Sequence, residues 1–202
     1  MFDDEFKRIN KIVLGKGIGW TRYTTVGHVY KEAKQYFKFL LKHFGNRQVS
    51  FVEIGVLKGG NFVLTGHLLN TLIGVGVDNG SYRLQDEFDA KHSVAALMPR
   101  FPYKILLGDS HATQIRETVV SIRDNFDLIY IDGDHSYKGV KQDFDIYAPL
   151  ANENGVIVFH DIVNIKTGVP KFWEEVKSRR KHLEFIHKET EEALAGIGVI
   201  FA

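Results

Sequence analysis

Short apolar runs separated by amphipathic stretches form the pattern of this chain from about residue 49 onward. Five of these runs are candidate strands, at residues 50–54, 72–77, 104–107, 127–131 and 155–159. Apolar residues at helical spacing fill residues 60–70, 84–97, 113–124, 137–150 and 169–180. Because strands alternate with helices, the pattern indicates βαβ units and a parallel sheet covered by helices on both faces.

The end of the chain has a different pattern. Residues 183–187 and 198–201 are two more candidate strands, joined through the acidic stretch 189–192. This connection is too short for a crossover helix, so the two strands are expected to pair antiparallel. The chain is therefore predicted to be α/β, with a doubly wound, Rossmann-like and mostly parallel sheet that ends in an antiparallel pair.

The first 45 residues stand apart from this alternation. Residues 30–44 suit an amphipathic helix, and residues 15–23 are rich in glycine and aromatic side chains. The glycine-rich stretch is either a surface loop or a mobile lid over a ligand, and a lid would make Trp20 and Tyr23 candidates for ligand contact. We see no linker or repeat, so we expect one domain with an N-terminal extension.

Composition and charge narrow the function classes. Lys and Arg together number 26 and Asp and Glu 25, so the charge does not favour nucleic acid. The absence of cysteine excludes disulfides, thiolate nucleophiles and cysteine-based metal sites. The acidic start is unlike a signal peptide, and no apolar run reaches the ~20 residues of a membrane span. We expect a cytoplasmic protein that does not bind membranes.

Two of the candidate strands end in acids and imidazoles. Asp132, Asp134 and His135 follow the run 127–131, and the run 155–159 is followed directly by His160 and Asp161. Parallel strands of an open α/β sheet hold ligands outside their carboxyl ends. These side chains are therefore expected to share one crevice, as a divalent-metal site or an acid/base site.

A glycine turn follows the first candidate strand. Glu53, Gly55, Gly59 and Gly60 lie between this strand and a helix, where glycine lets the backbone approach a ligand closely. The turn lacks the Lys-Ser/Thr end of a P-loop, and Leu57 occupies the second glycine position of a dinucleotide loop. That glycine serves a pyrophosphate, so its loss is compatible with a nucleoside ligand without phosphates.

Acids also close the next two strands. Asp78 offers two acceptor oxygens, which suit the hydroxyls of a ribose, although a lone aspartate more often caps a helix or loop. Asp109 is followed by Ser110, and both are good helix caps. Asp109 either accepts an adenine amino group or caps the next helix, and one role does not exclude the other.

Together these motifs resemble the class I S-adenosylmethionine-dependent methyltransferases. The similarity is to the family 24-like branch, which has the Glu-Ile-Gly-x-x-x-Gly-Gly turn and the Ile-Asp-Gly-Asp-His-x-Tyr segment and includes small-molecule and sugar O-methyltransferases. The resemblance implies a methyltransferase domain over residues 46–202, after an extension over 1–45, with seven strands in the order 3-2-1-4-5-7-6. The residues that it implies for the cofactor S-adenosylmethionine are Glu53, Gly55, Gly59, Gly60, Asp78, Asp109, Ser110 and Asp132.

The resemblance also implies a metal. Catechol-type and macrolide-sugar members hold magnesium at the ends of strands four and five, where Asp134 and Asp161 match the two acidic ligands. Those relatives have a further Asn or Asp beside the second acid, whereas this chain has His160 and Ile162. An imidazole ligand suits Mn²⁺, Fe²⁺ or Zn²⁺ better than Mg²⁺.

Two alternatives to the metal remain. In a metal-free enzyme, His135 or His160 is the general base. Otherwise both imidazoles satisfy backbone groups while Asp134 begins a helix. We predict O-methylation of a small molecule, by a chain that forms a homo-oligomer or a monomer. The alternatives are a nicotinamide-dependent oxidoreductase on a similar sheet and a non-catalytic, cofactor-binding partner protein.

Overall fold

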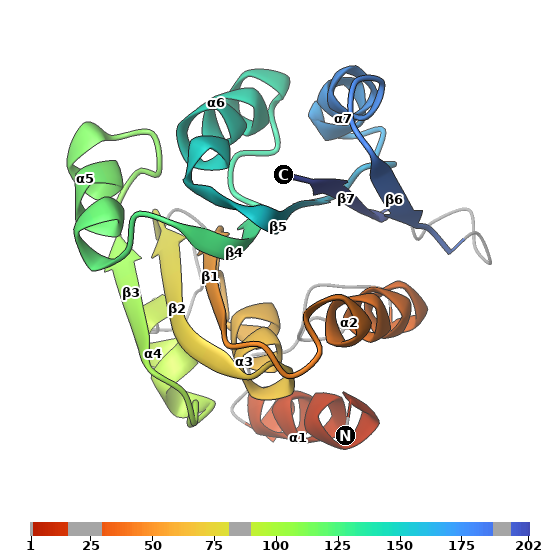
Figure 1. Ribbon diagram of the computed structural model, residues 1–202. Helices are drawn as coiled ribbons and strands as arrows, with labels where there is room; N and C mark the ends of the chain where they lie inside the picture. Colours follow the sequence, from red (N-terminus) through yellow and green to blue (C-terminus); the bar gives the residue numbers. More distant parts are fainter. Residues whose placement is uncertain (1, 16–29, 81–89, 188–194) are drawn as a thin grey trace.

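The computed structural model describes residues 2–15, 30–80, 90–187 and 195–202. Its centre is a seven-stranded sheet of order β3-β2-β1-β4-β5-β7-β6 (Figure 1). β1 to β5 are parallel, whereas β7 is antiparallel to both β5 and β6. The strands are β1 (Val49–Ile54), β2 (Thr71–Asp78), β3 (Tyr103–Leu107), β4 (Phe126–Ile131), β5 (Ala151–His160), β6 (His182–Phe185) and β7 (Ile197–Phe201). The predicted fold class and strand order are confirmed.

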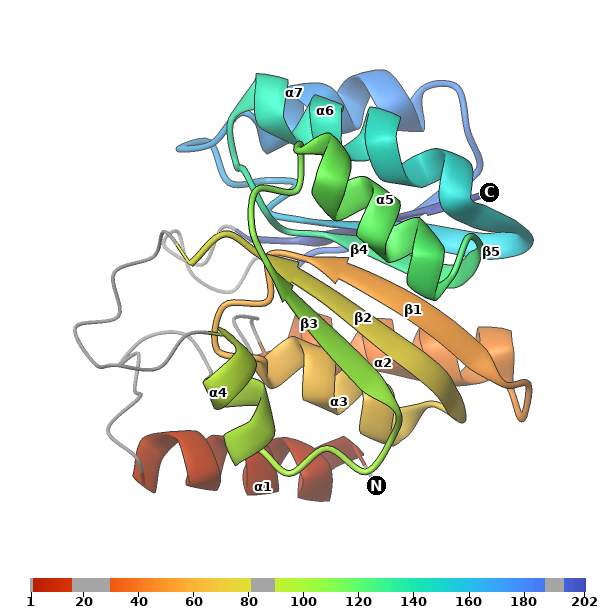
Figure 2. The same ribbon diagram turned by 90° about the vertical axis from the view of Figure 1, so that its left-hand side faces the viewer.

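Helices cover both faces of the sheet (Figure 2). One face carries α1 (Phe2–Gly15), α2 (Tyr30–Phe44), α3 (Gly60–Leu68) and α4 (Ala90–Ala96). The other carries α5 (Thr113–Ile122), α6 (Tyr137–Tyr147), the short 3₁₀ helix η1 (Ala148–Leu150) and α7 (Val169–Lys177). Successive strand residues point to opposite faces, so Phe51 and Tyr130 pack with the first group while Val52 and Ile129 pack with the second.

α1 was not predicted from the sequence. It begins with three acids, which favour a helix N-terminus, and it buries Phe6 and Ile9 in the core below the sheet. The predicted helix at 84–97 is described only over Ala90–Ala96, because residues 81–89 lie outside the described part. Trp20, Tyr23 and the connection 189–192 also lie outside it. No helix among the described residues is long and apolar enough to cross a membrane.

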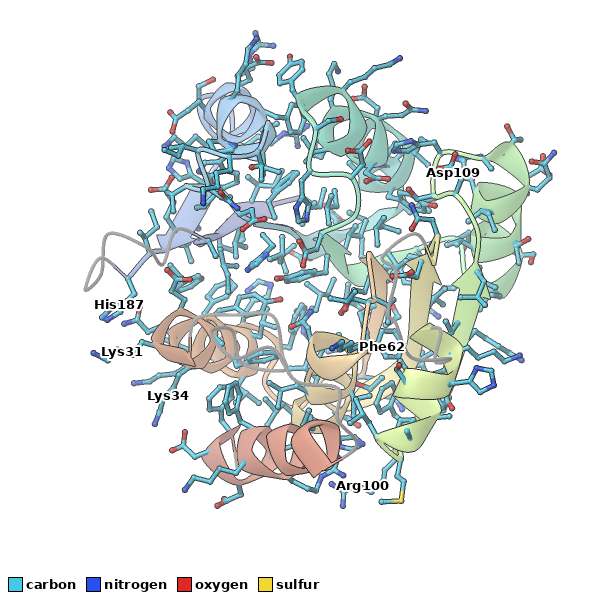
Figure 3. The ribbon with its side chains drawn as sticks, turned by 180° about the vertical axis from the view of Figure 1, so that it is seen from behind. Lys31, Lys34, Phe62, Arg100, Asp109 and His187 are labelled. Carbon is cyan, nitrogen blue, oxygen red and sulfur yellow. The ribbon has the colours of Figure 1, made fainter. Side chains whose placement is uncertain are left out.

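A polar contact fixes α1 to the rest of the molecule. The Glu5 carboxylate accepts a hydrogen bond of 2.9 Å from Arg8 Nε and contacts Nδ1 of His67 in α3. His67 Nε2 in turn accepts the backbone N–H of Arg100, which lies beside α1 in Figure 3. Burial alone would raise the pKa of Glu5, but Arg8 and His67 keep that pKa below its ordinary value. Helix α1 is thus held by this polar contact and by the hydrophobic core that it shares with the sheet.

Candidate active site

The carboxyl ends of the central strands meet at one edge of the sheet. Ile54 of β1 is paired with Val77 of β2 and with Ile131 of β4, and Ile131 is paired with Phe159 of β5. The residues that follow these positions therefore lie next to one another. They comprise the glycine turn and the acids and imidazoles singled out in the sequence.

The glycine turn approaches the end of β4 very closely. Gly55 has φ +85°, and a Cβ atom at this position would lie 2.0 Å from the backbone oxygen of Asp132. Gly59 also has a positive φ, +76°. Leu57 adopts φ +49° without being glycine, and its N–H donates a 2.7 Å hydrogen bond to Asp78 Oδ2. The turn is therefore held by a side chain of the neighbouring strand.

Glu53 lies directly under this turn. Its side chain is buried, and its Oε2 accepts a 2.8 Å hydrogen bond from Asn61 Nδ2, one residue after Gly60 at the start of α3. Burial raises the pKa of Glu53 well above its ordinary value, and the nearby carboxylates of Asp132 and Asp78 raise it further. Glu53 therefore favours its protonated form.

Asp78 and Asp109 both organise the turns that follow their strands. Asp78 Oδ1 accepts the N–H of Gly80 at 2.8 Å, and Asp109 Oδ1 accepts the N–H of His111 at 2.9 Å. The Asp109 side chain is 68% exposed and lies on the α5 side of the sheet (Figure 3). Both carboxylates remain open to a ligand, since each oxygen has a second lone pair.

The loop after β3 is tied to α6. Ser110 Oγ donates a 2.7 Å hydrogen bond to Oδ1 of Asp143, which is fully buried, and His111 Nε2 lies 3.1 Å from the same oxygen. One turn later, the Tyr147 hydroxyl donates to the Ser110 backbone oxygen at 2.9 Å. Asp143, Tyr147 and His111 were not predicted from the sequence as residues of the site.

Three residues form an acid–imidazole cluster: Asp132, His135 and Asp161. Each offers one ligand atom within 4.8 Å of the other two. His135 Nε2 lies 3.1 Å from Asp132 Oδ1, and His135 Nδ1 lies 3.3 Å from Asp161 Oδ2. The imidazole is thus placed between two carboxylates, and this cluster is the one group of its kind found among the described residues.

His160 lies behind the acid–imidazole cluster. It is the last residue of β5 and is 7% exposed. Its Nδ1 is 3.2 Å from Asp132 Oδ1 and 3.7 Å from Asp161 Oδ1. His160 therefore contacts both carboxylates from the interior.

The charges of this region depend strongly on one another. Burial alone would raise the pKa of Asp132, but His160 and His135 hold that pKa far below its ordinary value. The hydrogen bond to Asp132 raises the pKa of His135 to about 9. Burial alone would lower the pKa of His160, but Asp132 raises it overall, whereas burial raises the pKa of Asp161. His135 therefore favours its charged form at neutral pH.

Asp134 lies just before α6 and is not a member of the acid–imidazole cluster. Its Oδ1 accepts the N–H of Ser136 at 2.8 Å, and its carboxylate packs against Gly139 at the start of α6. Ser136 caps the same helix, since its Oγ accepts the N–H of Gly139. The acid–imidazole cluster thus contains Asp132 and His135 beside Asp161, whereas metal binding by Asp134 and His160 stays a prediction from the sequence.

Comparison with known proteins adds the family. Residues 52–162, more than half of the chain, match methyltransferase family 24, which is described as a methyltransferase domain. The chain belongs to this family. The matched segment contains the glycine turn and ends just after the acid–imidazole cluster.

A curated relative of this chain is an uncharacterised protein of Acanthamoeba polyphaga mimivirus, 28% identical over 122 residues. The match covers 60% of the present chain and 55% of the viral protein, so the chain spans about half the length of that relative.

Solved structures share the fold at low sequence identity. An O-methyltransferase from Bacillus cereus, in complex with S-adenosylhomocysteine, is 14% identical, with a TM-score of 0.65 over 99% of this chain and 91% of its own. TomG from Streptomyces achromogenes, in complex with S-adenosylmethionine, is 13% identical, with a TM-score of 0.67 over 99% and 90%. MycE of the mycinamycin pathway, solved with Mg, S-adenosylhomocysteine and mycinamycin VI, is 14% identical, with a TM-score of 0.58 over 96% and 54%.

Proposed function

We propose that this methyltransferase transfers a methyl group from S-adenosylmethionine to an oxygen atom of a small molecule. The observation that carries the proposal is the contact of Gly55 with the backbone of Asp132. It brings a turn suited to a nucleoside against the loop that carries the acid–imidazole cluster. A methyl donor bound at the turn would thus lie beside a group of residues able to handle an acceptor hydroxyl. The ligands of the Bacillus cereus enzyme and of TomG support this choice of donor.

The residues around the turn fit such a cofactor. Asp78 and Asp109 follow neighbouring strands and keep free lone pairs for ribose hydroxyls and for an adenine amino group. Gly55 and Gly59 let the turn pack directly against the backbone of Asp132 and against Val94, where a Cβ atom would lie at 2.0 and 2.4 Å. Glu53, hydrogen-bonded to Asn61, supports the same turn. When bound, the sulfonium of the cofactor supplies a methyl group that needs little beyond in-line placement.

The acid–imidazole cluster also fits a divalent cation. Two carboxylates and one imidazole with ligand atoms within 4.8 Å of one another make a mixed oxygen and nitrogen donor set. Such a set suits Mn²⁺ better than Mg²⁺, which prefers oxygen alone. We assign Asp132, His135 and Asp161 as its ligands. A cation bound there would lower the pKa of the acceptor hydroxyl. The Mg in MycE supports a metal at this fold.

The chain's own residues divide the handling of the acceptor proton. With no cation bound, His135 has a pKa of about 9, so at neutral pH it offers a positive charge rather than a free base, and a bound cation would replace that proton. Burial raises the pKa of Asp161, while Asp132 is held in its ionised form of low basicity. Asp161 is therefore the carboxylate better suited to accept the proton, and His135 the group better suited to stabilise the resulting oxyanion. His160 orients Asp132 and Asp161 from the interior.

Further parts of the proposal concern the whole chain. We assign residues 1–45 to an N-terminal extension, of which α1 and α2 are described, and residues 46–202 to a methyltransferase domain. The nearly balanced charge supports a small-molecule acceptor over a nucleic acid. A homo-oligomeric state and a cytoplasmic location stay predictions from the sequence.

Calorimetric titration with S-adenosylhomocysteine and, separately, with NAD⁺ tests the donor. We expect S-adenosylhomocysteine to bind and NAD⁺ not to bind, and the reverse result would overturn the proposal in favour of an oxidoreductase. Transfer of a labelled methyl group to panels of phenols, sugars and RNA then tests the acceptor. Labelling of RNA alone would contradict the small-molecule assignment. Tight cofactor binding with no transfer to any panel would favour a non-catalytic partner protein.

A further inference from the structure

We propose that Asp143 of α6 is a positioning residue that holds the loop after β3 and the loop after β4 in one arrangement. It rests on the proposed function, because the first loop carries Asp109 of the cofactor site and the second carries the acid–imidazole cluster. Asp143 would thus align the nucleoside end of the cofactor with the groups that handle the acceptor.

The contacts of Asp143 with the first loop are direct. Its side chain is fully buried, and its Oδ1 accepts the 2.7 Å hydrogen bond of Ser110 Oγ. The same oxygen lies 3.1 Å from His111 Nε2. Ser110 and His111 come immediately after Asp109 in the chain. One carboxylate oxygen therefore sets the position of two consecutive residues in this loop.

The other oxygen of Asp143 faces the second loop. A Cβ atom on Gly133 would lie only 3.0 Å from Asp143 Oδ2, so the backbone at this glycine lies close against the carboxylate. Burial raises the pKa of Asp143 overall, whereas Ser110, His111 and the backbone N–H of Asp134 act to lower it. Residues 133 and 134 lie between Asp132 and His135, so the carboxylate contacts the connection between two members of the acid–imidazole cluster.

α6 strengthens this link in two further ways. Tyr147, one turn after Asp143, donates to the Ser110 backbone oxygen at 2.9 Å, and residues four apart share one helix face. The helix begins at Tyr137 and is capped by Ser136, directly after His135. A shift of α6 would therefore move both loops together.

Packing alone does not explain why an acidic side chain, rather than an apolar one, occupies this buried position. Burying a charge destabilises a protein unless hydrogen bonds and opposite charges compensate, and an apolar side chain would fill a helix face without that cost. In return, hydrogen bonds to an ionised group are stronger and more directional than neutral ones. The hydroxyl of Ser110 provides this directional contact, and the ring of His111 lies 3.1 Å from the same oxygen.

The test compares Asp143→Asn with Asp145→Asn. The first variant keeps the shape and removes the charge, and the second changes an exposed acid of the same helix that pairs with Lys141 at 2.8 Å. The measurements are the dissociation constant of S-adenosylhomocysteine and amide hydrogen exchange across the chain. We expect Asp143→Asn to bind about tenfold more weakly or worse, with faster exchange at both 108–112 and 132–137. Asp145→Asn should stay within about twofold of the wild type in both measurements.

Ser110→Ala and Tyr147→Phe keep the test informative if Asp143→Asn does not fold. Each should weaken binding of S-adenosylhomocysteine relative to the wild type. If Asp143→Asn does fold, its effect should be larger than either, and adding Ser110→Ala to it should weaken binding little further, because the two residues share one hydrogen bond. Faster exchange in one loop only, in neither loop, or uniformly across the chain would overturn the inference. If the wild type does not bind S-adenosylhomocysteine, the proposed function fails, whereas the exchange data still decide whether Asp143 couples the two loops.

Discussion

The backbone N–H of Gly168 donates a hydrogen bond to the backbone oxygen of His135, and the two atoms lie 2.8 Å apart. Gly168 ends the loop that follows Asp161, so this bond joins the loop after β5 to the loop after β4. The two loops are tightly packed at this point, because a Cβ atom on Gly168 would lie 2.0 Å from the backbone nitrogen of Tyr137. The distance between His135 and Asp161 therefore depends on a backbone contact as well as on their side chains.

Gly168→Ala should disturb the acid–imidazole cluster more than the fold. The added methyl group must push the two loops apart, at a cost of about 1–3 kcal/mol in the free energy of unfolding. We expect Mn²⁺ affinity to fall about tenfold or more, since His135 would move relative to Asp161. Manganese titration and urea denaturation measure the two effects. Unchanged Mn²⁺ affinity in the folded variant would contradict the role of this contact.

Asp132→Asn and Asp161→Asn should each weaken divalent-metal binding, whereas Asp134→Asn should not. Asp132 and Asp161 face His135, while Asp134 accepts the N–H of Ser136 at the start of α6. We expect losses of about 10–100-fold for the first two variants and a change within about twofold for the third. Electron paramagnetic resonance of Mn²⁺ gives the affinities. A loss for Asp134→Asn as large as that for Asp132→Asn would restore Asp134 as the ligand.

Gly55→Ala should abolish cofactor binding, and Gly45→Ala is its matched control. Both glycines have positive φ, +85° and +56°, so alanine is strained at either position by about 1–2 kcal/mol. A Cβ on Gly45 meets nothing within 4 Å, while a Cβ on Gly55 would lie 2.0 Å from the Asp132 backbone oxygen. Thermal unfolding measures the backbone strain that both variants share. Titration with S-adenosylhomocysteine measures the effect of the clash, which only Gly55→Ala has. Equal behaviour of the two variants would show that the close approach is unimportant.

Asp127 should make the stability of the protein depend on pH. Its carboxylate accepts hydrogen bonds of 2.8 Å from both the N–H and the Oγ of Ser50, and one of 2.9 Å from Asn152 Nδ2. Burial alone would raise the pKa of Asp127, but these donors lower it below its ordinary value. The stabilisation is therefore fully present above the pKa of the unfolded chain and is lost as pH falls through the lower pKa of the folded protein.

Asp127→Asn should accordingly cost about 1–2 kcal/mol in the free energy of unfolding near neutral pH. The difference from the wild type should shrink as the pH is lowered through the acidic range. Urea denaturation at a series of pH values measures it, with Asp145→Asn as an exposed control. A difference that stays constant with pH would mean that the charge of Asp127 has no part in stability.

Most of the sheet could be predicted because its strands are continuous apolar runs. The antiparallel tail followed from the short connection before Ile197, which leaves no room for a crossover helix. α1 was missed although its signals were present, since Phe2, Phe6 and Ile9 have helical spacing and acids occupy the first turn. The contact that anchors it, between Glu5 and His67, joins residues far apart in the chain and has no local sequence signal.

For the candidate site, the sequence predicted the edge of the sheet where it lies but not which side chains face one another there. The topology of a parallel sheet places the ends of β4 and β5 together, but the choice between Asp132 and Asp134 depends on how the backbone turns at Gly133. Gly133 packs against Asp143 and Ile54, which lie far from it in the chain, and a local pattern does not reveal such contacts. A signal for Asp143 did exist, because it is an acid on the buried face that α6 forms with Val140 and Tyr147.

The last strand along the chain, β7, lies between β5 and β6 and pairs with β5 from Val156 opposite Phe201 to His160 opposite Ile197. During synthesis, β5 therefore pairs only with β4 until residues 197–201, which form β7, have left the ribosome. Until then, β5 has an unpaired backbone edge and apolar side chains, and such edges are prone to aggregation. We expect the acid–imidazole cluster to assemble late, so that chaperone dependence and the onset of metal binding both follow the emergence of residues 197–201 from the ribosome.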